Sequence, residues 1–131
     1  MDSYLGSTTI RGGTLFTGNV ASIRGGAIVL AATVKSSITS VTCTANKAEL
    51  GGAIAITSPG SFNERVYDKC VFADNTATDG GAMYMYSYPG SDVITDSAFR
   101  GNYASEIQLT SVDRDWMAPK PYVVVVLEVK L

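Results

Sequence analysis

The chain has no histidine and only two cysteines, Cys43 and Cys70, among its 131 residues. The commonest general base and the commonest soft-metal ligand are therefore both missing. Two thiols are too few for a disulfide scaffold or a thiolate zinc centre. We expect no cofactor and no soft-metal site.

Charge of either sign is also sparse. Ten Lys and Arg residues face twelve Asp and Glu residues, for a net charge of −2, and no basic run occurs. The electrostatic signature of a nucleic-acid-binding protein is missing, so we expect no nucleic-acid partner. No stretch approaches the roughly 20 apolar residues of a membrane-spanning helix, which predicts no transmembrane segment.

Residues 1–5 show neither the basic region nor the apolar core of a signal peptide. Either the protein stays inside the cell, or a targeting segment lies outside this sequence. Apolar residues make up 46% of the chain, and 13 Gly against 4 Pro indicate many turns rather than disorder.

A pair of short motifs recurs along most of the sequence. The first motif is Phe-x-x-Asn, with Cys43 replacing Phe in the second copy, and the second motif is Gly-Gly-Ala followed by Ile or Met. The first motif begins at positions 16, 43, 72 and 99, so its copies are 27, 29 and 27 residues apart. The second motif occupies residues 25–28, 51–54 and 80–83. A fixed period of this length is typical of stacked solenoid folds.

Each period holds two short apolar segments with strand-like alternation, and none shows a helical stripe. We therefore predict an all-β fold, a parallel β-helix (solenoid) of about five coils. The coils occupy residues 1–110. Residues 111–131 form a Pro-containing loop and a C-terminal strand at 122–131, which acts as a cap or pairs with another chain, because a free edge would invite aggregation.

Period-two alternation predicts the direction of each side chain. The larger residues should point inward: Ile28, Leu30, Ile54, Ile56, Met83, Met85, and a second column of Phe16, Cys43, Phe72 and Phe99. Their neighbours should point outward: Ala27, Val29, Ala53, Ala55, Ala82 and Tyr84.

The four asparagines of the first motif are expected to stack as a structural ladder. They are Asn19, Asn46, Asn75 and Asn102. Stacked Asn side chains pass hydrogen bonds from coil to coil or satisfy turn backbone groups. The diglycines should form a corner that needs positive φ or close backbone approach. A phosphate cradle is the alternative, but it would need a helix after the glycines.

The two cysteines are not equivalent in this register, since Cys70 matches Val41 rather than Cys43. A diagonal separation of roughly 7–8 Å between Cα atoms lies outside easy disulfide reach. We predict two buried free thiols, and a disulfide remains the alternative if the loop bends.

The alternation of Phe-x-x-Asn with Gly-Gly-Ala-Ile resembles the repeats of the chlamydial polymorphic outer-membrane proteins, over residues 12–109. This resemblance implies a right-handed β-helix that acts in adhesion, and a secreted or cell-surface location. The fourth copy lacks its diglycine. The motifs stabilise coils, so the resemblance is specific for fold and weak for function.

Tyr84, Tyr86 and Tyr88 alternate along one strand and should share its outer side with Val29, Ala53 and Ala55. Exposed aromatic rings stack on sugars or anchor protein interfaces. The leading hypothesis is a non-catalytic binding or structural module that docks a protein partner or a cell-surface glycan on this face. Alternatively, the tyrosines simply cover small side chains of the coil below.

A polysaccharide-processing β-helix enzyme, similar to a pectate lyase or a glycosidase, is the rival function. Asp74 and Asp79 flank one turn and are weak calcium candidates. Ala45 and Leu50 occupy the equivalent places one coil earlier, so no acidic column forms. A third hypothesis, ice binding by a threonine array, has little support because the threonines do not recur at one position.

Overall fold

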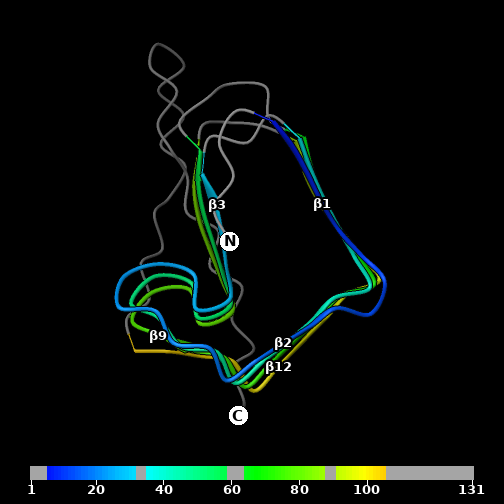
Figure 1. The fold of residues 1–131 in the computed structure, drawn as a ribbon. Helices are drawn as coiled ribbons and strands as arrows, with labels where there is room; N and C mark the ends of the chain where they lie inside the picture. Colours follow the sequence, from blue (N-terminus) through cyan, green and yellow to red (C-terminus); the bar gives the residue numbers. More distant parts are fainter. Residues whose placement is uncertain (1–5, 32–34, 59–63, 88–90, 106–131) are drawn as a thin grey trace.

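The computed structural model describes residues 6–31, 35–58, 64–87 and 91–105 (Figure 1). Within these ranges the regular secondary structure consists of β-strands alone. The strands are β1 (Ser7–Ile10), β2 (Leu15–Thr17), β3 (Ile28–Ala31), β4 (Lys35–Thr39), β5 (Thr42–Thr44), β6 (Ile54–Ser58), β7 (Glu64–Asp68), β8 (Val71–Ala73), β9 (Thr76–Ala77), β10 (Met83–Ser87), β11 (Ser91–Thr95), β12 (Ala98–Arg100) and β13 (Tyr103–Ala104).

Each strand pairs in parallel with the strand one repeat away, which gives three main sheets. Sheet 1 has the order β1-β4-β7-β11, sheet 2 the order β2-β5-β8-β12 and sheet 3 the order β3-β6-β10; β9 and β13 form a smaller pair. The register follows the sequence repeat, because Phe16, Cys43, Phe72 and Phe99 are successive partners. The repeat therefore sets the strand pairing.

The described ranges correspond to successive coils, which we call coil 1 (6–31), coil 2 (35–58), coil 3 (64–87) and coil 4 (91–105). Figure 1 looks down this stack, where strands of different colours lie over one another along each sheet. The predicted all-β, parallel β-helix architecture is confirmed. The right-handed sense stays a prediction. The expected fifth coil and the C-terminal strand at 122–131 lie outside the described residues.

The core runs along the inside of the stack, where equivalent side chains meet. All the residues predicted to point inward on sheet 3 are completely or almost completely buried: Ile28, Leu30, Ile54, Ile56, Met83 and Met85. In sheet 2, Cys43 and Phe72 are buried, and Phe16 and Phe99 pack against the same core from either end. The rings of Phe72 and Phe99 stack with centroids 4.8 Å apart.

Two alanines predicted to face outward do not. Ala53 and Ala82 are completely buried members of the core. Each directly follows a diglycine and directly precedes the first strand residue, Ile54 or Met83. The alternation of a strand does not apply to them, because the backbone is still turning there. The carbonyl of Ala53 accepts hydrogen bonds from both Ala27 and Ile28, which fixes this turn against coil 1.

The expected exposed row of apolar residues on sheet 3 is also wrong at its centre. Ala55 has no exposed surface. It lies in β6 between Val29 and Tyr84, its register partners on either side. Because Ala55 is buried, this position offers no exposed surface to a partner.

The diglycine corners meet both conditions that the sequence suggested. The first glycine of each pair has positive φ, 54° at Gly25, 68° at Gly51 and 65° at Gly80. The second glycine has no room for a side chain: a Cβ on Gly52 would lie 2.1 Å from the carbonyl oxygen of Gly81. Since the following segment is a strand, these corners serve the stacking of coils.

This difference between the glycines is testable by alanine substitution. Gly52→Ala should lower the free energy of unfolding by about 3 kcal/mol or more, because backbone of the next coil must move. The control is Gly18→Ala, where φ is +64° but nothing lies within 4 Å of the new Cβ. It should cost about 1 kcal/mol. Urea denaturation followed by circular dichroism measures both, and equal losses would contradict the close-approach argument.

Candidate functional site

The predicted asparagine ladder is present and runs through all four coils. The Nδ2 of Asn19, Asn46 and Asn75 donates to the Oδ1 of the next asparagine at 2.9 Å in every step. The same Oδ1 also accepts the backbone N–H of the preceding asparagine, at 3.0–3.1 Å. Asn46, Asn75 and Asn102 are buried, so these bonds form away from water.

The second Nδ2 hydrogen of each inner asparagine reaches back by one coil. Asn46 donates to the carbonyl of Phe16, and Asn75 donates to the carbonyl of Cys43. Asn102 donates to the carbonyl of Phe72 in the same way. The amide group of an inner asparagine is thus consumed by contacts to the coils before and after it, and it is unavailable to a ligand.

An asparagine in the middle of the ladder should contribute far more to the free energy of unfolding than the one at its end. Asn75→Leu removes an acceptor of two N–H groups and leaves the buried carbonyl of Cys43 without this donor. We expect a loss of about 3–5 kcal/mol in the free energy of unfolding, from about 1–3 kcal/mol for each unsatisfied group.

Asn19→Leu is the matched control, because Asn19 is exposed and its backbone N–H bond to Asn46 survives. It should cost about 1 kcal/mol or less. Chemical denaturation of both variants gives the comparison. Similar costs at the two positions would show that the ladder does not depend on burial.

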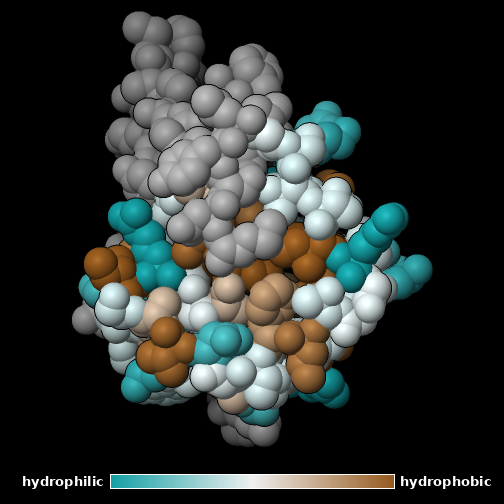
Figure 2. Space-filling model, in the orientation of Figure 1, coloured by the Kyte–Doolittle hydropathy of each residue, from teal (hydrophilic) through white to brown (hydrophobic). Residues whose placement is uncertain are grey.

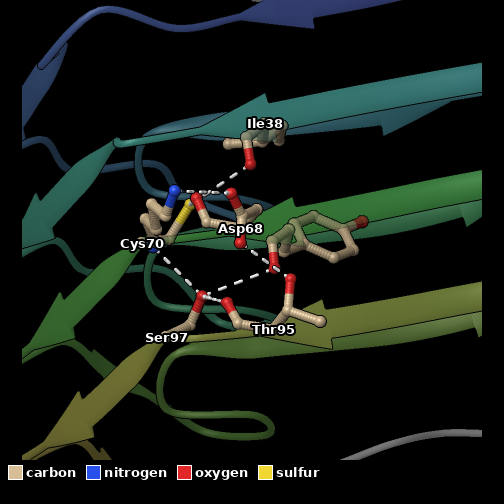
Figure 3. A network of polar contacts seen from close by, with 7 residues as sticks. Ile38, Asp68, Cys70, Thr95 and Ser97 are labelled. Carbon is tan, nitrogen blue, oxygen red and sulfur yellow. Dashed lines mark hydrogen bonds and ion pairs between the residues drawn. The ribbon is translucent and has the colours of Figure 1, made fainter.

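Both cysteines are free and buried, as predicted, and Cys70 lies at the corner between β7 and β8 (Figure 3). Its thiol bonds to the carbonyl oxygens of Ile38 and Asp68, each at 3.3 Å. The hydroxyl of Ser97, one coil later, donates to the carbonyl of Thr95 and accepts the N–H of Cys70. This network closes a corner between coils and leaves no thiol poised for chemistry.

The surroundings of the thiols make them poor nucleophiles. Burial, with a smaller contribution from the nearby Cys70, raises the pKa of Cys43 from 9.0 to about 12. Burial also raises the pKa of Cys70. A reactive cysteine needs a lowered pKa, so both residues act as small apolar fillers at neutral pH.

The raised pKa of Cys43 makes stability depend on alkaline pH. The folded state holds this proton more tightly than the unfolded chain, so the contribution is complete below pH 9 and is lost as pH rises towards about 12. Relative to Cys43→Val, the native protein should lose about 2 kcal/mol more between neutral pH and about pH 10.5. Denaturation curves across this range test it, and parallel pH profiles would contradict it.

The two calcium candidates have different environments. Asp74 is exposed and has a φ of +55°, in a column of left-handed residues with Gly18, Ala45 and Gly101. The residue before each ladder asparagine therefore forms a tight turn, a role that the sequence interpretation missed. Asp79 is buried, and its Oδ1 has no hydrogen-bond partner. Across the described ranges, no three His, Cys, Asp or Glu residues are grouped closely enough to hold a metal ion.

On the outer side of sheet 3, the structure places two of the proposed contact residues. Val29 and Tyr84 are partly exposed, on either side of the buried Ala55. Tyr86 lies in β10, but its side chain is outside the described part of the structure, as is all of Tyr88. The idea of a docking face therefore keeps Tyr84 and Val29 as its described members, without Ala53 and Ala55.

The interior of sheet 1 holds a polar column that sequence reasoning also missed. Thr8, Ser36 and Arg65 are register partners on β1, β4 and β7, and all three are buried. Arg65 alternates with Glu64 and Val66, which are exposed, and shares the inner side with Tyr67. The sequence did contain a signal for the buried Arg65. Tyr67 pairs with the inward Ile38, and alternation places Arg65, two residues before Tyr67, on the same inner side.

One space-filling view, along the same direction as Figure 1, shows where apolar side chains reach one face of the molecule (Figure 2). Figure 2 shows hydrophobic residues within the outline of the coil and at its rim, separated by hydrophilic side chains. The most exposed large apolar residues lie on the first and last described coils: Leu15, Val20 and Ile23 on coil 1, and Tyr103 on coil 4. Val66 and Val93, partners on the outer side of sheet 1, are less exposed.

Comparison with known families identifies one repeat. The Chlamydia polymorphic membrane protein (Chlamydia_PMP) repeat matches residues 13–31, which contain the first Phe-x-x-Asn and the first diglycine. This confirms the resemblance at the level of the repeat. No curated protein and no solved structure shows a significant match. In the described ranges, no helix has the length and apolar character needed to cross a membrane.

Proposed function

We propose that this protein is a non-catalytic, surface-associated β-helix module that presents a rigid outer face to a protein partner or a cell-surface glycan. The observation that carries the proposal is the use of the repeated residues. The asparagines, the diglycines and the inward apolar columns all contact neighbouring coils. A surface role also agrees with the polymorphic membrane protein repeat at residues 13–31.

The outward residues support this proposal, because their identities change from coil to coil while the residues that contact neighbouring coils are repeated. In sheet 2, the outer positions before the Phe or Cys are Leu15, Thr42, Val71 and Ala98. After the ladder asparagine the residues are Val20, Lys47, Thr76 and Tyr103. Stacking does not require particular residues at these places, so they are free to carry recognition.

Within the outer surface, sheet 3 is the favoured contact face. Val29 on coil 1 and Tyr84 on coil 3 provide an aliphatic and an aromatic side chain on either side of Ala55, and both keep part of their surface in water. A partly exposed tyrosine on a rigid strand loses little entropy on binding, which suits an anchor residue.

The test is adhesion of protein-coated beads to cultured epithelial cells. Tyr84→Ser should reduce bound beads at least five-fold, because loss of an aromatic anchor costs about 2 kcal/mol. Tyr84→Phe, which keeps the ring, should retain most of the binding. Thr9→Ser, an exposed change on sheet 1, is the control, and circular dichroism checks that every variant is folded.

Trypsin or glycosidase treatment of the cells then separates a protein partner from a glycan. Adhesion that survives Tyr84→Ser in a folded protein would remove sheet 3 from the proposal. A complete lack of adhesion by the native chain would overturn the binding function itself.

A further inference from the structure

We propose that the outer side of sheet 1 docks on the same face of a second copy of this chain, so that two chains form a weak, two-fold symmetric dimer. The two-fold axis runs parallel to the strands, and the order of the coils is therefore reversed in the second copy. This surface differs from the outer side of sheet 3, so the inference is independent of the adhesion proposal.

The outer side of sheet 1 is a flat face whose side chains are described on all four coils. Its strands lie over one another along one straight side of the coil (Figure 1). Two sheets can pack face to face about 10 Å apart. The outward side chains form three columns that keep surface in water: Ser7, Lys35 and Glu64; Thr9, Ser37, Val66 and Val93; and Thr39, Asp68 and Thr95.

The middle column of this face is uncharged and partly apolar. Val66 and Val93 are register partners on neighbouring coils and are 38% and 42% exposed. Among the described outward residues, charges occur only in the two outer columns, at Lys35, Glu64 and Asp68. An apolar centre with a polar margin is the general plan of a protein interface.

The charges of the outer columns decide how two such faces can meet. Lys35 and Glu64 follow one another on coils 2 and 3, with Nζ and Oε2 3.1 Å apart. A two-fold axis parallel to the strands, passing between these coils, puts Lys35 of each copy opposite Glu64 of the other. The same axis puts the hydroxyl of Thr39 opposite the carboxylate of Asp68. Each pair forms twice, because a two-fold contact is reciprocal.

A two-fold axis parallel to the stack would be unfavourable for the same face. It exchanges the first and third columns, so Glu64 of one copy would meet Asp68 of the other, and like charges in contact oppose association. The charges therefore select the dimer with reversed coil order. That order also brings the exposed Arg11 of coil 1 towards the exposed Asp96 of coil 4 in the other copy.

The size of the face sets the strength of the dimer. Its longest strands have five residues, so by strand rise and spacing the face measures roughly 17 Å by 19 Å. A standard stable interface covers about 800 Å² on each partner, so this smaller face favours a weak and reversible dimer.

Sedimentation equilibrium at low salt, where surface charges are least screened, tests the dimer. The average mass of the native chain should rise with concentration and stop at that of a dimer, because a two-fold contact closes on itself. K35E and E64K should each raise the dissociation constant about ten-fold or more, since like charges then face each other twice. The controls K47E and E49K make the same charge changes at exposed positions outside sheet 1 and should associate like the native chain. Circular dichroism shows whether each variant keeps its fold.

An equimolar mixture of K35E and E64K tests the pairing itself. In the mixed dimer both contacts join opposite charges, so association should return, although the ion pair within each chain stays broken. Tighter association of E64K alone would contradict the axis, because it is expected only where Glu64 meets Asp68. The proposal is overturned if the native chain stays monomeric through the submillimolar range, if K47E weakens association as much as K35E does, or if the mixture stays monomeric.

Discussion

Every repeated feature of this chain depends on in-register parallel stacking of one coil on the next. The 2.9 Å bond between Asn75 and Asn102 requires both residues to lie at the same height in their coils. The approach of Gly52 to Gly81 requires the same alignment at another corner. A shift of one residue would break the asparagine ladder, bring side chains against the diglycine corners and turn the inner side chains outward. Cooperation between these contacts explains why one short phrase recurs while other positions vary.

Sequence reasoning succeeded where a residue's neighbour is its own copy in the next coil. The inward columns, the ladder and the two roles of the diglycine follow from the period and from side-chain chemistry alone. It failed where the local backbone departs from a strand. Ala53 and Ala82 precede their strands, so alternation misplaced them. The left-handed turn before each asparagine was not recognised, because Gly, Ala and Asp all occupy that position. Alternation places Ala55 on the outer side of its strand and does not reveal that this side is buried there.

The polar interior of sheet 1 shows that stacking tolerates variety when geometry permits it. Thr8, Ser36 and Arg65 lie in register inside the coils, although sheets 2 and 3 are apolar there. Burying an arginine is costly unless its donors are satisfied, so this column is the most demanding part of the interior. Length changes are likewise confined to connections: coil 1 has four steps from Val20 to Arg24, where coil 2 has three from Lys47 to Leu50. The strands themselves keep their register.

Stacking divides the positions of this chain into two kinds. Outward residues on the sides of the stack are left unconstrained by stacking, so they can vary without loss of stability. Inward and corner residues are constrained by their own copies in the neighbouring coils. The amide group of Asn75, for example, donates to the coils on both sides, to the carbonyl of Cys43 and to the Oδ1 of Asn102. The strength of the stack and the freedom of its sides therefore have one origin, because a small, repeated set of residues makes the contacts between coils.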